Sequence, residues 1–460
     1  MKESNENVMK RDAIDFERMK IGRLFRKLFI PTVLGMLFSS LFIVTDGIFV
    51  GKGIGSEALA AINMVSPLWL LGSGIGLMFG VGGSVVASIQ LSKGKLKVAR
   101  INMSQAFVCC FILMTVLSFL CVIHAETIVG LMGCSDSLFD NAVVYLRWFM
   151  PFMPTNVLLS MGLFFLRVDG SPKMAMACNV IASIANAILD YLFILVFQWG
   201  LRGAAIASSL GSVIGAIMVL WYIFDKRHKL SFYPIKLSSH SIILMYRNVR
   251  YMIRLGFSAF LCELALGMMM LLGNITFLKY LNSDGVAAFS VACYLIPIMF
   301  MVYEAIAQSA QPIISYNHGL NIRQRVIKAF GLSVGVALIC GIVFALMLTI
   351  GNNIVVSIFI DADEYAFILA TRGLPYFSIG LIPFAFNIVV TGYYQSVDRA
   401  KPATIITLLR GFILLYLSFH FISEWFGEKG IWLSVAVAEG LTMIYIIARS
   451  LLGRRYFKRG

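Results

Sequence analysis

Twelve apolar stretches run through this chain, and each is long enough to cross a lipid bilayer. A transmembrane helix needs about 20 predominantly apolar residues. Hydrophobic side chains make up 59% of the chain and charged ones only 13%. The pattern therefore predicts an all-α polytopic membrane protein with twelve transmembrane helices, several of them long enough to be tilted or kinked. The expected spans are residues 28–50, 58–91, 102–124, 142–166, 174–198, 203–224, 251–279, 285–316, 327–350, 366–396, 403–423 and 430–452.

Lysine and arginine are distributed unevenly between the two sets of connections. Of the 38 Lys and Arg residues, 31 fall in the N-terminal segment, the C-terminal tail and the connections on the same side of the membrane or at the span ends next to them. Because Lys and Arg mark the cytoplasmic side, both termini are expected in the cytoplasm and the protein in the cell (cytoplasmic) membrane. The net charge of +15 then reflects topology and attraction to anionic lipids. No nucleic-acid partner is expected.

The basic segment 225–250 separates two halves that repeat each other. Residues 55–62 match residues 282–289 at an offset of 227, and residues 199–203 match residues 426–430 at the same offset. Six spans per half give both halves one orientation. The sequence thus predicts two pseudo-symmetric six-helix lobes with a cavity between them, an arrangement typical of alternating access. The predicted parts are a cytoplasmic segment 1–27, an N-lobe 28–224, a linker 225–250, a C-lobe 251–452 and a cytoplasmic tail 453–460.

One carboxylate lies deep in the first predicted span. Counted from Leu28 at about 1.5 Å per residue, Asp46 is roughly 27 Å along the helix. An ionised side chain at this depth costs at least about 2.5 kcal/mol on insertion scales, so an intramembrane acid indicates a functional site that faces protein or water. The alternative is an acid near a helix end that reaches the headgroups.

A second acid is expected at a similar depth in the fifth span. Asn186 and Asp190 are four residues apart, so they share one face of a helix. Asp190 lies about 24 Å from the cytoplasmic start of its span, close to the depth of Asp46. Two acids and an amide at one depth predict either an oxygen cage for Na⁺ or a proton acceptor.

Several motifs accompany these acids. They are Pro31, residues 46–51 (DGIFVG), residues 55–61 (GSEALAA), Pro67, residues 167–172 (RVDGSP), residues 186–190 (NAILD) and residues 308–319 (QSAQPIISYNHG). Together they resemble the multidrug and toxic compound extrusion (MATE) family over nearly the whole chain, with matching length, span count and duplicated lobes. The resemblance implies a twelve-helix antiporter with a V-shaped pair of lobes. Such an antiporter expels small organic, often cationic, compounds in exchange for Na⁺ or H⁺.

The resemblance also implies roles for single residues. In this family the positions that match Asp46, Asn186 and Asp190 carry the coupling cation, so these three residues are the expected coupling site. Na⁺ is the only metal expected there, and no cofactor is expected. For Asn186 and Asp190 the alternative is a hydrogen-bonded pair that only holds the lobe together.

The second half offers candidates for substrate binding or a second coupling site. Glu263 resembles the acidic position of span seven in one branch of the family, and Asn387 stands where a partner acid in span ten would be expected. Structural pairing between helices and substrate contact both remain open for the other polar residues within these spans. The remaining candidates are Glu304, Gln308 and Glu439, with Arg410 as a further polar residue.

Nothing in the sequence indicates an enzyme. The eight cysteines and five histidines show no metal-ligand spacing, and no nucleophile lies near a base. Glycine-rich patches such as residues 72–76 and 80–83 are not preceded by a strand, as a phosphate-binding loop would be. They indicate close approach of helices instead.

The expected function is therefore cation-coupled export of small organic compounds by a monomer in contact with membrane lipids. One alternative with the same fold is a flippase of lipid-linked saccharides, which would need a strongly cationic cavity. Another is an exporter of an endogenous metabolite. A membrane-embedded enzyme or channel is a third alternative, and the absent catalytic cluster and the twofold repeat argue against it.

Overall fold

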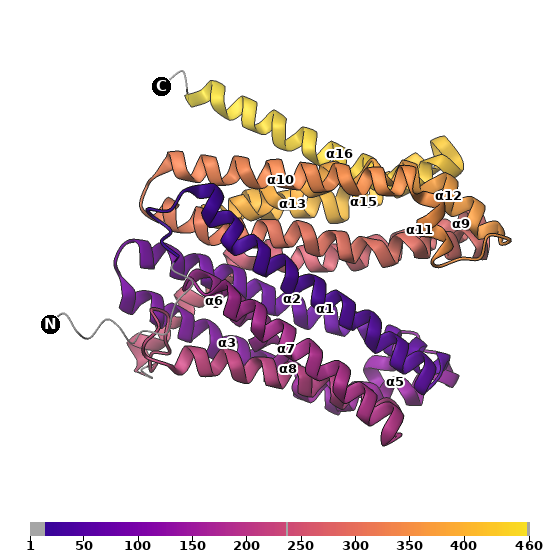
Figure 1. The fold of residues 1–460 in the computed structure, drawn as a ribbon, viewed down its shortest axis with the longest axis horizontal. Coiled ribbons are helices and arrows are strands. Elements are labelled where there is room, and N and C mark those ends of the chain that lie inside the picture. The colour runs from indigo at the N-terminus through magenta and orange to yellow at the C-terminus, as the bar shows by residue number, and fades with distance from the viewer. Residues whose placement is uncertain (1–13, 236–237, 458–460) are drawn as a thin grey trace. The chain divides into compact units, whose positions relative to one another are not determined.

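The computed structural model of the protein describes residues 14–235 and 238–457. All regular elements in these residues are helices (Figure 1). The first half contains α1 (Ile21–Gly53), α2 (Ser56–Ser92), α3 (Leu96–Ile123), α4 (Ala125–Leu131), α5 (Asp136–Phe149), η1 (Met150–Phe152), α6 (Met153–Val168), α7 (Pro172–Asp190), the π-helical η2 (Tyr191–Val196) and α8 (Gly200–Phe224).

The second half begins with the longest helix and contains two further π-helical turns. Its elements are α9 (Ser239–Gly319), α10 (Arg323–Ile350), α11 (Asn352–Ser357), α12 (Tyr365–Ser378), α13 (Leu381–Ser396), α14 (Ala400–Leu408), η3 (Leu409–Ile413), α15 (Leu414–Leu417), η4 (Ser418–Ile422) and α16 (Ser423–Phe457).

The predicted fold class of twelve spans is confirmed. Nine helices in the described residues are long and apolar enough to cross a membrane, and α12 with α13, bent by 46°, forms a tenth candidate. Two of these helices each contain a residue with non-helical backbone angles: Asn282 within α9 and Gly427 within α16. Dividing the chain at these two breaks brings the count in the described residues to twelve. Most segment ends lie within a few residues of the predicted spans, but α1, α3 and α5 begin six or seven residues earlier and α9 has a longer extension at its start.

The repeat of 227 residues is visible in the backbone. Positive φ angles occur at Gly55 and Asn282, at Gly94 and Asn321, and at Gly200 and Gly427, and each pair is separated by this offset. Left-handed backbone favours Gly or Asn, which explains why both copies place one of these residues at the turn. The π-helical turns η2 and η4 also start 227 residues apart, at Tyr191 and Ser418.

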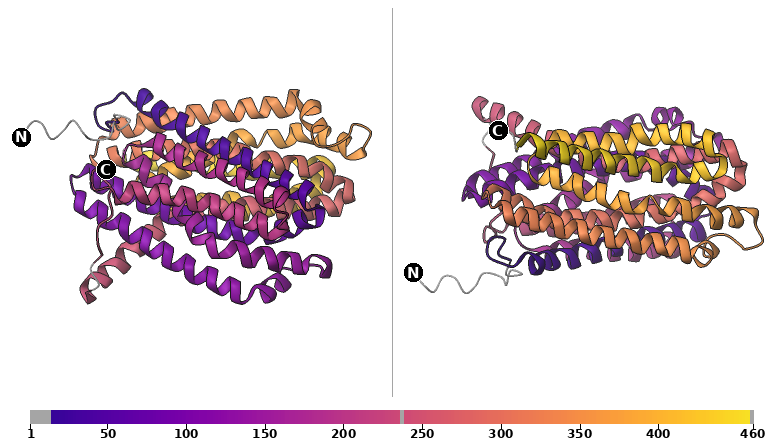
Figure 2. Two further views of the ribbon diagram at one scale, coloured as in Figure 1. Left: turned by 60° about the horizontal axis from the view of Figure 1, so that its bottom comes forward. Right: turned by 90° about the horizontal axis from the view of Figure 1, so that it is seen from above.

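The chain divides into two compact units, which are described separately. The first comprises residues up to 260 together with 311–326, and the second comprises residues 261–310 together with 327–460. Within the first unit the long helices run roughly parallel or antiparallel to one another (Figures 1 and 2). The boundaries of the predicted lobes and linker remain predictions.

Equivalent positions of the repeat contact each other inside the first unit. Gln311 donates a hydrogen bond from Nε2 to Ser84 Oγ at 2.8 Å, and Ser315 Oγ donates to Ser88 Oγ at 2.8 Å. The partners in both pairs are 227 residues apart. Such contacts are expected where two copies of a repeated structure meet.

The predicted close approach of helices at the glycine patches is confirmed. A Cβ atom at Gly82 would lie 2.0 Å from the carbonyl oxygen of Met252, and one at Gly256 would lie 1.9 Å from that of Met78. No side chain fits at these distances. Glycine on both helices therefore allows backbone-to-backbone packing between α2 and the start of α9.

Candidate functional site

The structure places Asp46 next to Asp190. Asp46 lies on α1, Asp190 is the last residue of α7, and their carboxyl groups are close enough to interact electrostatically. Two further contacts hold these helices together: Asn179 Nδ2 donates to the carbonyl oxygen of Gly35 at 3.1 Å, and the hydroxyls of Ser39 and Ser183 lie 3.4 Å apart. Distant parts of the sequence thus build one acidic pair inside the membrane-spanning region.

Asn186 contacts Asp190, as the spacing of four residues along one helix predicts. Its Nδ2 atom lies 2.9 Å from Asp190 Oδ2 and 3.4 Å from Ser208 Oγ on α8. The site therefore includes a hydroxyl that the sequence prediction missed. Ser208 is one of many serines in apolar spans, and only the packing of α7 on α8 distinguishes it from the others.

Within the part of the chain that the structure describes, the acidic pair has no fixed counter-charge. Among residues 14–235 and 238–457, no Lys, Arg or His forms an ion pair with Asp46 or Asp190. The Oδ1 atom of each acid is buried and lacks a hydrogen-bond partner in the same residues. Two carboxylates in contact cannot both stay charged in a low-dielectric site unless a cation or a proton compensates them. The site can therefore bind an exchangeable cation.

Two neighbouring features shape this site. The π-helical turn η2 follows Asp190 directly, and π-turns within α-helices often mark functional sites. The buried side chain of Tyr145 on α5 is within electrostatic range of both acids. Tyr145 was also not predicted from the sequence, because its role depends on which helix lies beside α1.

The donor set suits a hard cation. It combines two carboxylates, an amide and a hydroxyl, and oxygen ligands of this kind bind hard cations. No group of three or more His, Cys, Asp or Glu side chains suited to a metal ion occurs in the described residues. The site is thus suited to a transported ion or proton and lacks the ligands of a permanently bound transition metal.

In the second unit the candidate residue Glu439 is paired with a base. Arg410, on the π-helical turn η3, donates from Nε and Nη2 to Glu439 Oε1 at 3.0 and 2.9 Å. Both residues are only 4% exposed. Asn387 Nδ2 adds a bond of 2.7 Å to Glu439 Oε2, and Arg410 also lies 4.6 Å from the centre of the Phe384 ring. The contact between Arg410 and Glu439 is a pairing between helices of the kind that the sequence analysis left open for these two residues, and Asn387 joins it.

The other candidates of the second half, Glu263, Glu304 and Gln308, lie on α9. Gln308 donates to Glu304 at 3.1 Å, one turn away on α9. Arg410 contacts Cys262 Sγ at 3.4 Å, and the neighbouring Glu263 is buried. The structure thus gathers Asn387, Glu439 and Arg410, whereas Glu304 and Gln308 bond to each other. The roles of all these residues remain predictions.

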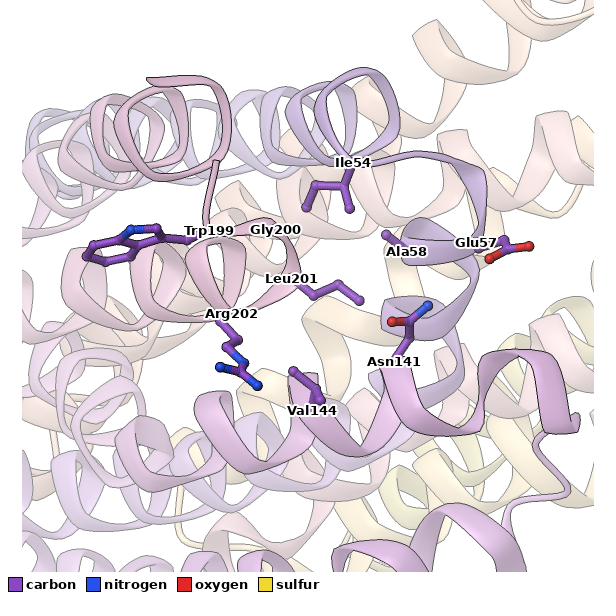
Figure 3. Close-up of a pocket in the computed structure, with 9 residues that line it drawn as sticks. All are labelled: Ile54, Glu57, Ala58, Asn141, Val144, Trp199, Gly200, Leu201 and Arg202. Atoms are coloured by element: carbon purple, nitrogen blue, oxygen red, sulfur yellow. The ribbon is translucent and has the colours of Figure 1, made fainter. Parts of the chain in front are cut away.

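A pocket of about 420 Å³ lies in the first unit, at the end of α1 opposite its N-terminus (Figure 3). Asn141, Val144 and Leu201 point into it, and Glu57 and Arg202 lie on opposite sides (Figure 3). The complete lining is Ile54, Glu57, Ala58, Asn141, Val144, Trp199, Gly200, Leu201 and Arg202. No polar candidate from the sequence analysis lines this pocket.

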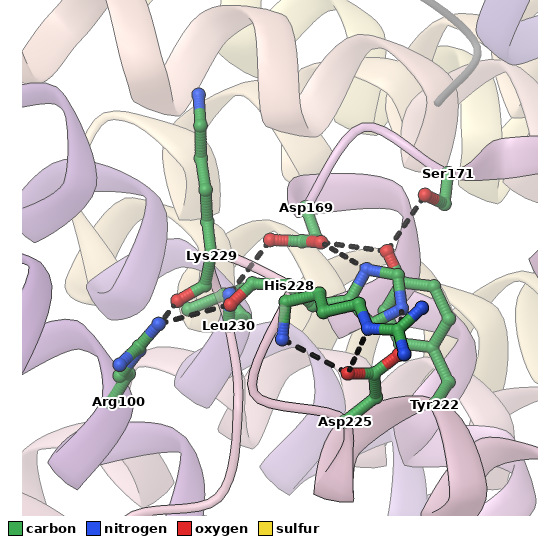
Figure 4. A network of polar contacts seen from close by, with 9 residues as sticks. Arg100, Asp169, Ser171, Tyr222, Asp225, His228, Lys229 and Leu230 are labelled. Carbon is green, nitrogen blue, oxygen red and sulfur yellow. Dashed lines mark hydrogen bonds and ion pairs between the residues drawn. The ribbon is translucent and has the colours of Figure 1, made fainter. Parts of the chain in front are cut away.

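Asp169, from the motif at residues 167–172, belongs to a polar network at the other end of the first unit (Figure 4). It accepts hydrogen bonds from the Tyr222 hydroxyl at 2.6 Å and from the backbone N–H of Leu230 at 2.7 Å. His228 stacks on Tyr222 with ring centres 3.6 Å apart, and Arg100 donates to the carbonyl oxygens of His228 and Lys229. The motif therefore anchors the segment that follows α8.

Comparison with known proteins agrees with this architecture. The MatE family model matches residues 31–192 and 259–421, one segment in each repeat. The fold and the intramembrane acids define a polytopic membrane transporter. The chain belongs to the MatE family of multidrug efflux transporters, so the predicted resemblance is confirmed.

Relatives with assigned functions are similar over almost their full length. Multidrug export protein MepA of Staphylococcus aureus (strain NCTC 8325 / PS 47) is 24% identical over 429 residues, which cover 93% of this chain and 92% of that protein. MepA of Staphylococcus saprophyticus is 23% identical over 429 residues, 92% of each chain.

Solved structures show the same fold. An outward-facing multidrug resistance MATE family transporter of the MOP superfamily matches with a TM-score of 0.85 and 19% identity, covering 97% of this chain and 98% of the other. A MOP superfamily transporter from Pyrococcus furiosus matches with a TM-score of 0.84 and 19% identity, covering 96% and 97%. At this identity the likeness concerns the fold alone.

Proposed function

We propose that the protein is a secondary active antiporter that exports small organic, often cationic, compounds in exchange for Na⁺ or H⁺. The observation that carries this proposal is that Asp46 and Asp190 are neighbours, with the Oδ1 atom of each acid buried and with no fixed base beside them among the described residues. The coupling cation is the only cofactor in this proposal, and Asp46, Asn186 and Asp190 hold it.

The site links cation binding to the conformation of α1. Neutralising the acidic pair removes the repulsion between α1 and α7 and favours the arrangement in which the two acids share one cation. A ligand shifts a conformational equilibrium by its difference in affinity for the two states. Cation binding from the side opposite the basic connections therefore reorganises α1 and weakens substrate binding, and release of the cation on the other side restores it.

An organic cation is also attracted electrostatically by buried carboxylates. Burial strengthens the attraction between a carboxylate and a lipophilic cation, and aromatic faces add a cation-π contribution. The names of the Staphylococcus relatives support drug-like substrates. We further propose that the protein acts as a monomer in the cytoplasmic membrane with both termini in the cytoplasm, as the distribution of Lys and Arg predicts.

The test is transport by the purified protein in lipid vesicles. Efflux of a fluorescent lipophilic cation is followed under an imposed Na⁺ gradient and, separately, under a proton gradient. At least one gradient is expected to drive efflux in the parent, and Asp46→Asn is expected to abolish it. Asp140→Asn, an exposed acid on α5, is the matched control and retains efflux. Gradient-driven efflux that survives in Asp46→Asn would refute the coupling role, and parent protein that responds to neither gradient would refute antiport.

A further inference from the structure

The pocket of Figure 3 is lined by the C-terminal end of α1 and by residues of α5 and α8, and these helices also carry Asp46, Tyr145 and Ser208. On α1 the residues Asp46 and Val50 are four apart, and Ile54 in the pocket lining follows after four more. At about 1.5 Å per residue, Ile54 is roughly 12 Å from Asp46 along the helix axis. Val50, between them, is fully buried. One face of α1 therefore leads from the pocket to the first acid.

Two further helices show the same order. On α5, Asn141 and Val144 line the pocket. Tyr145 follows Asn141 by one helical turn and interacts electrostatically with both acids. On α8, Leu201 lines the pocket and Ser208, which receives the bond from Asn186, lies two turns below it. Residues three, four or seven apart share a helix face. Each of the three helices thus carries a pocket residue and, one or two turns farther along the same face, a residue of the acidic site.

Each of the three helices carries an apolar residue at the pocket or one turn from it toward the acids. Val144 and Leu201 line the pocket, Val50 lies one turn from Ile54 toward Asp46, and Val50 and Leu201 are buried. A narrow apolar constriction excludes ions while it is dry and admits them when water enters, which is the principle of hydrophobic gating. We call these three residues the apolar collar.

We propose that this pocket is the access vestibule of the coupling cation and that the apolar collar gates passage from it to Asp46 and Asp190. The inference rests on the antiport function proposed above and adds the route by which the cation arrives. Glu57 and Arg202 carry opposite charges at the rim, so the vestibule provides access without selecting ions by net charge. Ion selection then occurs at the acidic pair.

A residue on the route changes the rate of cation exchange, whereas a residue of the site changes the affinity. Asn141→Trp fills the open pocket and is expected to slow exchange of ²²Na⁺ or protons across vesicles at least 5-fold. Leu201→Ser makes the collar polar and is expected to speed exchange at least 3-fold. In both variants the cation affinity, measured as cation-dependent thermal stabilisation of the solubilised protein, is expected to stay within twofold of the parent. Asp140→Trp, on the exposed face of α5, is the control for bulk and is expected to exchange at the parental rate.

The outcomes separate this inference from the proposed function. Parental exchange rates in both Asn141→Trp and Leu201→Ser would overturn the vestibule while leaving antiport intact. A large loss of affinity in either folded variant would also overturn it, because that residue would then act on the acidic pair itself. Parent protein that shows neither cation exchange nor cation-dependent stabilisation would refute antiport, and the vestibule would fall with it.

Discussion

The two repeats share the same order of helices but differ in their buried charged residues. The first repeat contains the acidic pair of Asp46 and Asp190. The positions that correspond to Asp46 and Asp190 at the offset of 227 are Gly273 and Leu417 in the second repeat. At Gly273 a side chain would collide with the Phe289 ring, 2.3 Å from an added Cβ atom. The second repeat therefore has no equivalent of the acidic pair, although its helices follow the same order.

The first repeat, in turn, lacks the buried ion pair of the second. Arg410 and Glu439, the buried ion pair of the second repeat, correspond to Ser183 and Ser212 in the first. An acid that an arginine neutralises permanently has its counter-charge attached to the chain. An acid without one can accept an exchangeable cation. In the first repeat the acids thus require an exchangeable cation as their counter-charge. In the second repeat the counter-charge of Glu439 is the guanidinium of Arg410.

Removing the fixed counter-charge is expected to have the largest energetic effect. Arg410→Met leaves Glu439 buried without its base, and breaking a buried ion pair on one side costs about 3–5 kcal/mol of stability. Denaturant unfolding of the solubilised protein measures this loss. Arg410→Met combined with Glu439→Gln is expected to recover more than half of it, and Arg372→Met, at an exposed position, is expected to stay within about 0.5 kcal/mol of the parent. An unchanged single variant would contradict the pairing.

Making the first repeat resemble the second is expected to abolish coupling. Asp190→Leu installs the residue found at position 417 and removes one of the two acids. Gradient-driven efflux is expected to fall at least ~100-fold, which corresponds to about 2.7 kcal/mol. Because the replacement removes a buried carboxyl group, thermal stability is expected to be equal or higher. Coupled efflux that persists in a folded Asp190→Leu protein would show that the acidic pair is not the coupling site.

A fixed base can also be added to the first repeat. Ser183→Arg places a guanidinium where Arg410 stands in the second repeat, on the face of α7 that carries Asn186 and Asp190. This cation competes with the exchangeable one, so the apparent cation affinity is expected to fall about 10-fold, or about 1.4 kcal/mol. Ser183→Leu controls for bulk. Equal cation dependence in the two variants would mean that charge at this position does not reach the site.

The smallest expected effect concerns the hydroxyl that only the structure revealed. Ser208→Ala removes a hydrogen-bond partner of Asn186, which loosens the amide beside Asp190. A single hydrogen bond contributes about 0.5–1.5 kcal/mol. This bond is long at 3.4 Å, so the loss is expected to be about 0.5–1 kcal/mol and the apparent cation affinity to fall about 2–5-fold. Ser209→Ala is the matched control, because its hydroxyl bonds to Ala205 on its own helix. A larger effect in Ser209→Ala than in Ser208→Ala would contradict this geometry.

Most of the fold was predictable from the sequence because hydropathy and charge act locally. Each apolar run has to become a helix in lipid whatever its neighbours are, so the spans were found to within a few residues. Turn residues such as Gly55 and Asn282 also act locally, through their backbone preference, and revealed the repeat. The candidate acids were identified because a carboxylate in an apolar run is unusual in any fold.

Tertiary structure alone decided which residues meet. The depth of Asp46 and Asp190 follows from counting along helices, but their contact depends on α1 packing against α7, as Asn179 and Gly35 now do. The pairing of Glu439 with Arg410 and the position of the pocket next to the apolar collar depend in the same way on helix neighbours and rotations. Side-chain packing between helices sets these rotations, and the order of residues along one helix does not contain that information.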